Sequence, residues 1–142
     1  MGTKTDGAMM SSVSQAKRAG RTILVVDDEP GILNLIQRVL KNVGYNVITS
    51  RSGDRAWEVF KQGQTKIDLV LTDMVMPGSM DGFTLAENAR RKYTKLPVLF
   101  MTGAVPESDE KAAAMIKKRL LLRKPFSPKE LVEFIDSHLG ES

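Results

Sequence analysis

The sequence has no cysteine among its 142 residues, and this absence removes several kinds of chemistry. Disulfide bridges, thiolate metal sites and cysteine nucleophiles are all excluded. The absence also fits a reducing compartment. A single histidine, His138, stands late in the chain and has no second histidine at a metal-binding spacing. We expect no metal site around it.

Long hydrophobic runs are also missing from the sequence. No apolar stretch approaches the roughly 18 residues that a membrane-spanning helix requires. Residues 1–20 are small and polar, and they lack the apolar core of a secretory signal. The sequence therefore predicts a cytoplasmic protein without a membrane partner.

Positive charge exceeds negative charge only modestly, since 21 Lys and Arg against 17 Asp and Glu give a net charge of +4. The surplus is spread along the chain, with local clusters at residues 90–92 and 117–119. Both clusters fall at expected helix C-termini, where cations complement the helix dipole. No recognition helix or aromatic-basic strand platform follows, so direct binding to nucleic acid is not expected.

Apolar residues make up 42% of the chain and charged residues 27%, a balance typical of one globular domain. Residues 1–20 show little periodicity, which predicts a disordered tail or leader before a folded domain at residues 21–140. Within that domain, apolar runs predict strands at 22–26, 45–49, 68–72, 97–101 and 120–122.

Helical patterns lie between the expected strands. The first has Pro30 in its first turn and an apolar face from Ile32 to Val43. Further helices are expected at 54–62, 82–93 with Asp81 as N-cap, and 108–118. Ser127 and Glu130 form a capping-box pattern that opens the last helix, which Gly140 ends.

This alternation of strands and helices predicts an α/β fold with a doubly wound parallel sheet and helices on both faces. In such sheets, ligands bind beyond the carboxyl ends of the strands. Five polar residues follow the ends of four expected strands: Asp27, Asp28, Asp73, Thr102 and Lys124. We expect them to converge on one edge of the sheet.

Three carboxylates at one edge repel one another. At an effective dielectric constant near 20, each pair about 4 Å apart costs on the order of 4 kcal/mol. A hard divalent cation offsets this repulsion, and Mg²⁺ favours carboxylate oxygens together with a carbonyl and water. With Lys124 and Thr102 nearby, such a site suits phosphoryl transfer onto a carboxylate.

The motifs resemble those of the receiver domain family (response regulator, chemotaxis Y-like) over residues 22–139. They are Ile23-Leu24-Val25-Val26-Asp27-Asp28-Glu29, residues 68–77 around Asp73, Met80-Asp81-Gly82, Met101-Thr102-Gly103 and Lys124-Pro125-Phe126. The spacings are 45 residues (28 to 73), 29 residues (73 to 102) and 22 residues (102 to 124). The ordered set is far more specific than any of its members.

The resemblance implies a flavodoxin-like, five-stranded sheet in the order 2-1-3-4-5 and a role in phosphorelay signalling. It implies that Asp73 accepts a phosphoryl group, while Thr102 and Lys124 contact phosphoryl oxygens. Asp28, Asp73 and the backbone carbonyl of Val75 would bind Mg²⁺ directly, and Asp27 through a water molecule.

The same resemblance implies the partners and the kind of activity. The phosphodonor would be a histidine kinase or a histidine phosphotransfer domain. An output protein would bind the fourth helix, fifth strand and fifth helix of a monomer or weak dimer. The domain would promote its own phosphorylation and dephosphorylation without being an enzyme for other substrates. It could stand alone or come from a hybrid histidine kinase.

The sequence departs from the family pattern at three places. Leu121 stands three residues before Lys124, where receivers usually carry an aromatic or histidine switch residue. The loop at 77–82 is one residue longer than the commonest form. Val75 and Ala104 replace polar residues that can position hydrolytic water, which predicts a long-lived phosphoryl group.

Two other classes of function remain alternatives. A non-phosphorylated interaction domain could use the same fold, although it would have no need for crowded carboxylates. A small aspartyl-phosphate phosphatase would place Asp-x-Asp after the first strand, whereas this chain has Asp27-Asp28-Glu29-Pro30. Nucleotide binding is not favoured, because no glycine-rich phosphate loop follows the first strand.

Overall fold

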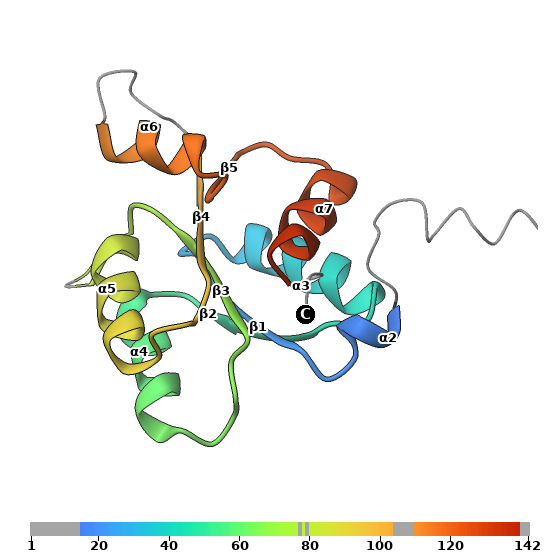
Figure 1. The fold of residues 1–142 in the computed structure, drawn as a ribbon, viewed down its shortest axis with the longest axis horizontal. Coiled ribbons are helices and arrows are strands. Elements are labelled where there is room, and N and C mark those ends of the chain that lie inside the picture. The colour runs from blue at the N-terminus through green and yellow to red at the C-terminus, as the bar shows by residue number, and fades with distance from the viewer. Residues whose placement is uncertain (1–14, 77, 79, 104–109, 140–142) are drawn as a thin grey trace, which may run out of the picture.

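A single five-stranded parallel sheet forms the centre of the computed structural model, which describes residues 15–76, 78, 80–103 and 110–139 (Figure 1). The strands run in the order β2-β1-β3-β4-β5, which confirms the expected flavodoxin-like sheet. They are β1 (Thr22–Val26), β2 (Asn46–Ser50), β3 (Leu69–Asp73), β4 (Val98–Thr102) and β5 (Leu121–Arg123).

Helices cover both faces of the sheet, as the sequence predicts. In Figure 1, α4 and α5 lie on one side and α3 and α7 on the other. The helices are α2 (Gln15–Arg18), α3 (Pro30–Asn42), α4 (Gly53–Gln62), α5 (Gly82–Lys92), α6 (Glu110–Lys117) and α7 (Pro128–Leu139).

The buried side chains form two hydrophobic clusters, one on each face of the sheet. Phe60, Leu85 and Phe100 belong to the cluster beneath α4 and α5. Ile36 and Ile135 belong to the cluster beneath α3 and α7. Alternate residues of β1 point into opposite clusters, because successive side chains of a strand face opposite ways. This explains why β1 is apolar at nearly every position.

Side-chain caps fix where several helices begin. The Ser52 hydroxyl accepts the Arg55 backbone N–H at 3.1 Å, and the Asp81 carboxylate accepts that of Thr84 at 2.9 Å. The expected capping box at α7 is confirmed by reciprocal bonds of 2.8 and 3.0 Å between Ser127 and Glu130. These caps satisfy N–H groups that have no partner within the helix.

Strands β2 to β5 each begin and end one residue later than expected. The expected strands ended at Thr72 and Met101, but Asp73 and Thr102 continue β3 and β4 and pair with Met101 and Arg123 in the ladder. The fourth helix was expected at 108–118, whereas α6 spans Glu110–Lys117, and residue 108 lies outside the described residues. Gly140, expected to end the last helix, also lies outside them.

The expected disordered segment at 1–20 is wrong for residues 15–20. Residues 15–18 form α2, and Arg18 is buried against α7 through a 2.8 Å ion pair with Asp136. The sequence around Arg18 is polar and has no periodic pattern, so it did not predict this tertiary contact. Residues 1–14 lie outside the described part of the chain.

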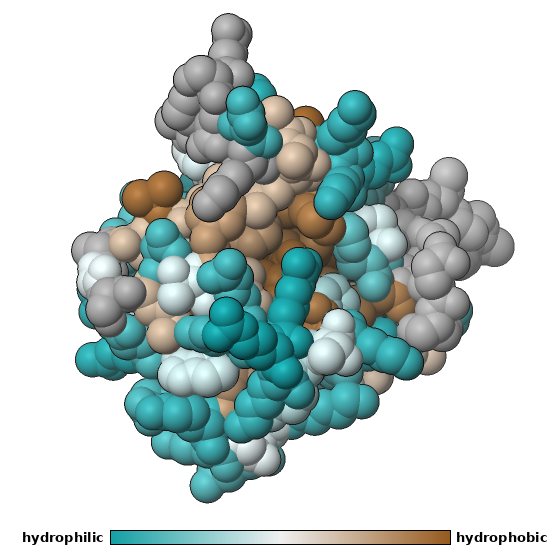
Figure 2. Space-filling model, turned by 60° about the vertical axis from the view of Figure 1, so that its left-hand side comes forward, coloured by the Kyte–Doolittle hydropathy of each residue, from teal (hydrophilic) through white to brown (hydrophobic). Residues whose placement is uncertain are grey.

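The surface combines mostly hydrophilic residues with local hydrophobic areas. On the face drawn in Figure 2, hydrophobic residues gather in one central area that hydrophilic residues border. Among the described residues, no helix is both long enough and apolar enough to cross a membrane.

Candidate functional site

Three carboxylates meet at the carboxyl edge of the sheet. Asp27 and Asp28 follow β1, and Asp73 is the last residue of the neighbouring strand β3. One oxygen from each carboxylate lies within 4.8 Å of the others. The parallel arrangement brings together residues that are distant in sequence, as the sequence predicts.

Asp27 is held by both of its carboxylate oxygens. Its Oδ1 accepts the backbone N–H of Glu29 at 2.9 Å, and its Oδ2 accepts Nζ of Lys124 at 2.7 Å. Its own backbone N–H donates to the Ser50 carbonyl at the end of β2. Asp27 is fully buried, so these bonds fix its orientation.

Lys124 brings a positive charge to the carboxylates from the loop after β5. Its Nζ lies 3.6 Å from Asp73 Oδ2 and 3.4 Å from Glu29 Oε1. Its backbone N–H donates to the Thr102 carbonyl at 2.8 Å, which anchors it beside β4. The Lys124–Pro125 bond is cis.

Backbone contacts fix Asp73 at the end of β3. The Thr72 hydroxyl donates to the Asp73 carbonyl at 3.0 Å, and the Met74 N–H donates to the Met101 carbonyl at 3.0 Å. Gly82, the first residue of α5, lies against the Asp73 carbonyl. A Cβ at position 82 would be 2.2 Å from the oxygen of that carbonyl. Glycine at this position lets α5 begin directly beside the site.

Burial dominates the electrostatics of Asp73, which is 9% exposed. Burial raises the pKa of its carboxyl, and the nearby charge of Asp27 acts in the same direction. The charge of Lys124 and a hydrogen bond from the Val75 backbone N–H oppose this without cancelling it. The ionised form of Asp73 is therefore disfavoured at this edge of the sheet.

For Lys124, the neighbouring charges outweigh the effect of burial on the pKa. Burial alone would lower its pKa, but the hydrogen bond to Asp27 and the charges of Asp73, Asp27 and Glu29 together raise it. The ammonium is therefore charged across the physiological range. It offsets part of the repulsion among the three carboxylates.

The remaining predicted site residues take different positions. Thr102 ends β4 beside β3 and is buried, so it shares the edge with Asp73. The side chain of Val75 is 75% exposed. Ala104 lies outside the described residues, as do Pro77 and Ser79 of the longer loop. Leu121 is buried beside Phe100, its β5–β4 partner.

Two residues contribute to the site without a role having been assigned to them from sequence. Glu29 donates its N–H to Asp27 and contacts Lys124, and Gly82 permits close approach of α5. The signal for Glu29 was its place two residues after Asp27, the spacing of an Asx turn. The need for Gly82 follows from a tertiary contact and has no local signal.

The donor set fits a hard divalent cation. Carboxylate oxygens are the ligands preferred by Mg²⁺, and three of them converge here.

A doubly wound sheet with clustered carboxylates, a lysine and a threonine at its carboxyl edge defines a class of protein. It is a class of α/β signalling domains. Residues 23–136 match the sequence model of the response regulator receiver domain. The chain belongs to this family.

Similar proteins agree with this assignment. The response regulator GtcR of Aneurinibacillus migulanus is 34% identical over 119 residues, which cover 84% of this chain and 48% of that protein. A response regulator receiver protein from Sinorhizobium medicae has a TM-score of 0.73 and 28% identity, with 85% and 95% of the two chains covered.

The receiver domain of the hybrid histidine kinase CckA is also similar, with a TM-score of 0.65, 29% identity, and 83% and 98% of the two chains covered. The chain spans about half the length of curated relatives such as GtcR. The shared part is the receiver domain, a signalling module of two-component phosphorelay systems.

Proposed function

We propose that Asp73 accepts a phosphoryl group from a phosphohistidine and that this event switches the domain between two signalling states. The observation that carries the proposal is the convergence of Asp27, Asp28 and Asp73 within 4.8 Å, with Lys124 at 3.6 Å from Asp73. Of the three carboxylates, Asp73 lies at the end of the central strand β3 and pairs with Met101, the residue before Thr102 in β4.

The proposed step is an in-line displacement at phosphorus. A carboxylate oxygen of Asp73 attacks and forms a P–O bond while the P–N bond of phosphohistidine breaks. The bonding electron pair stays on the imidazole nitrogen, which takes a proton from solvent. Asp73 acts as the nucleophile in its ionised form, so no general base is needed.

Residues around Asp73 stabilise the transferred group. Lys124 donates to a phosphoryl oxygen, which requires its ammonium to leave the 2.7 Å bond with Asp27 or to share it. The Thr102 hydroxyl donates to another phosphoryl oxygen from the end of β4. Thr102 ends β4, and the Lys124 backbone N–H is bonded to the Thr102 carbonyl, so the backbone of both donors is held at the edge of the sheet.

Mg²⁺ is the cofactor that the donor set favours. Asp28, Asp73 and the Val75 carbonyl would bind it directly and Asp27 through a water molecule, and the ion would neutralise negative charge on the phosphoryl oxygens. Asp27 suits an indirect role because both of its oxygens already accept hydrogen bonds.

The partners follow from the same proposal. A histidine kinase or a histidine phosphotransfer domain supplies the phosphoryl group, and an output protein binds α6, β5 and α7. We also propose a cytoplasmic location, an activity limited to the domain's own phosphorylation and dephosphorylation, and a monomer or weak dimer. Origin from a hybrid kinase stays a prediction, supported by similarity to the receiver of CckA.

Incubation with acetyl phosphate and Mg²⁺ tests the proposal, with intact-mass analysis as the readout. We expect a phosphoryl-sized mass gain in the wild type that is lost when Mg²⁺ is chelated and in Asp73→Asn. Circular dichroism confirms that each variant is folded. A folded wild type without any mass gain would refute the proposal and favour a non-phosphorylated interaction domain.

A further inference from the structure

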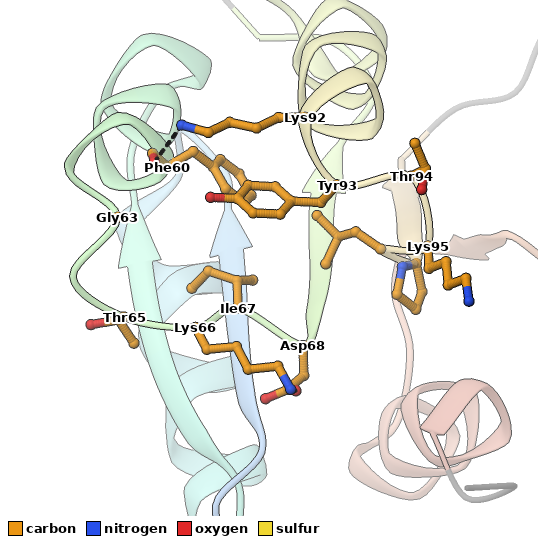
Figure 3. Close-up of a pocket in the computed structure, with 12 residues that line it drawn as sticks. Phe60, Gly63, Thr65, Lys66, Ile67, Asp68, Lys92, Tyr93, Thr94 and Lys95 are labelled. Carbon is orange, nitrogen blue, oxygen red and sulfur yellow. Dashed lines mark hydrogen bonds and ion pairs between the residues drawn. The ribbon is translucent and has the colours of Figure 1, made fainter.

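A second concave site lies at the opposite end of the sheet from Asp73. This basal groove has a volume of about 750 Å³ and is formed by the segments before β3 and β4 with the ends of α4 and α5 (Figure 3). Its lining residues are Phe60, Gly63, residues 65–68 and residues 92–97. None of them belongs to the proposed phosphorylation site.

Aromatic and aliphatic groups line the interior of the basal groove. The rings of Phe60 and Tyr93 lie 5.7 Å apart between centroids, and Figure 3 shows them next to each other between α4 and α5. Ile67 and Leu96 extend the apolar lining. Phe60 is buried, whereas Tyr93 is 39% exposed, so part of its ring is open to contact from outside.

Three lysines surround this lining and only one acid faces them. Lys66 comes from the segment 65–68 and Lys92 and Lys95 from the segment 92–97, against Asp68 alone. The Oδ2 of Asp68 already accepts the Thr22 backbone N–H at 2.8 Å. The groove therefore carries a surplus of positive charge.

The lysines are held only loosely in the structure. Lys92 donates to the Phe60 carbonyl at 3.4 Å, near the limit for a hydrogen bond, and Lys66 lies 3.7 Å from Asp68 with its side chain 89% exposed. No described residue forms an ion pair or hydrogen bond with Lys95. A carboxylate would be a stronger acceptor than these weak partners.

We propose that the basal groove binds an acidic protein segment that inserts one aromatic or large aliphatic side chain. Tyr93 and Phe60 would pack against the inserted side chain, and the lysines would pair with flanking carboxylates. The three lysines lie on two segments of the groove, and three positive charges suit an extended segment with several acids better than a ligand with one charge. A nucleic acid fits less well, because Asp68 would face its phosphates.

This interaction is distinct from phosphorylation of Asp73. Strand β3 separates Asp68 from Asp73, a distance of about 16 Å at roughly 3.3 Å per residue. The groove and the phosphorylation site therefore share no side chain. Binding to the groove is expected in Asp73→Asn as well, so failure of one proposal is distinguishable from failure of the other.

Amide NMR shifts test the proposal with a capped synthetic peptide, Glu-Asp-Phe-Asp-Glu. We expect the peptide to shift amides of residues 63–68 and 92–97 and to alter the fluorescence of Trp57, the only tryptophan, whose ring lies 6.0 Å from that of Phe60. Replacing Phe by Ala in the peptide, or Tyr93→Ala in the protein, should weaken binding roughly tenfold, whereas Tyr93→Phe should not.

Charge variants provide the matched control. Lys92→Gln with Lys95→Gln should weaken binding roughly tenfold, whereas Lys41→Gln with Lys129→Gln removes the same charge from α3 and α7 and should leave it unchanged. The proposal is overturned if millimolar peptide shifts no groove amides or if the two double variants behave alike. Tighter binding of short single-stranded DNA to the same amides would also overturn it.

Discussion

At the scale of single residues, the buried carboxylate of Asp73 lowers the stability of the folded protein. Burial raises the pKa of its carboxyl despite the nearby Lys124, so the ionised form is disfavoured by the fold. An acidic group whose pKa is higher in the folded than in the unfolded state lowers the free energy of unfolding at pH values above its folded-state pKa. The cost disappears as the pH falls through it, because the folded state then takes up the proton more readily than the unfolded chain.

Asp73→Asn should therefore stabilise the metal-free protein by on the order of 1 kcal/mol at neutral pH. Urea unfolding in the presence of a chelator measures this, and the gain should shrink as the pH is lowered through the folded-state pKa of Asp73. Glu133→Gln, on the exposed side of α7, is the control. A destabilised Asp73→Asn would contradict the claim of crowded charge.

The lifetime of the phosphoryl group is a second residue-scale prediction. The Val75 side chain is exposed and offers no polar atom to orient the water that hydrolyses an aspartyl phosphate. Val75→Asn supplies such an atom and should shorten the lifetime several-fold. Loss of the phosphoryl mass over time measures this, and an unchanged rate would show that position 75 does not control hydrolysis.

At the scale of elements, helix α5 begins in direct contact with the end of β3. A Cβ on Gly82 would lie 2.2 Å from the Asp73 carbonyl oxygen and 3.1 Å from the Met74 Cα, and both neighbours are backbone. Neither can move without disturbing the candidate site. The close packing of the first residue of α5 therefore helps to hold the backbone of Asp73 in place.

Gly82→Ala should destabilise the protein by roughly 2 kcal/mol and slow phosphorylation. Gly31→Ala is the matched control, because Gly31 also lies in the first turn of a helix but has nothing within 4 Å of an added Cβ. The control should be neutral or slightly stabilising. Thermal unfolding measures both, and equal effects would contradict the close contact.

The sequence predicted these elements well because each leaves a periodic or capping signal. The five strands and the caps at Asp81 and Ser127 are confirmed, and so is the strand order, which only the family resemblance implied. Strand ends were misplaced by one residue because hydrogen bonding continues into polar residues such as Asp73. Contacts such as Gly82 against Asp73 depend on tertiary packing, which no local pattern encodes.

At the scale of the whole molecule, a buried polar network ties α2 to α7 and to Tyr45, the residue before β2. The Arg18 guanidinium donates to both carboxylate oxygens of Asp136 at 3.2 and 2.8 Å, and the Tyr45 hydroxyl donates to the same carboxylate. Burial, followed by the contact with Asp136, raises the pKa of Tyr45 and keeps it neutral. The network extends the fold before β1, where residues 15–20 were expected to be disordered.

Arg18→Met should cost roughly 3 kcal/mol of unfolding free energy, because it leaves the Asp136 carboxylate buried without its cation. Arg38→Met on the exposed face of α3 is the control. Adding Asp136→Leu to Arg18→Met should recover part of the loss. Chemical denaturation measures each variant, and a loss below about 1 kcal/mol would show that α2 is not an integral part of the domain.

The most direct test of the central claim maps the phosphoryl group to one carboxylate. Borohydride reduces an acyl phosphate to the corresponding alcohol, which marks the acceptor permanently for peptide mass spectrometry. After treatment with acetyl phosphate and Mg²⁺, we predict that residue 73 is the homoserine-bearing position and that Asp27 and Asp28 are unmodified. Reduction at Asp27 or Asp28, with Asp73 intact, would contradict the account.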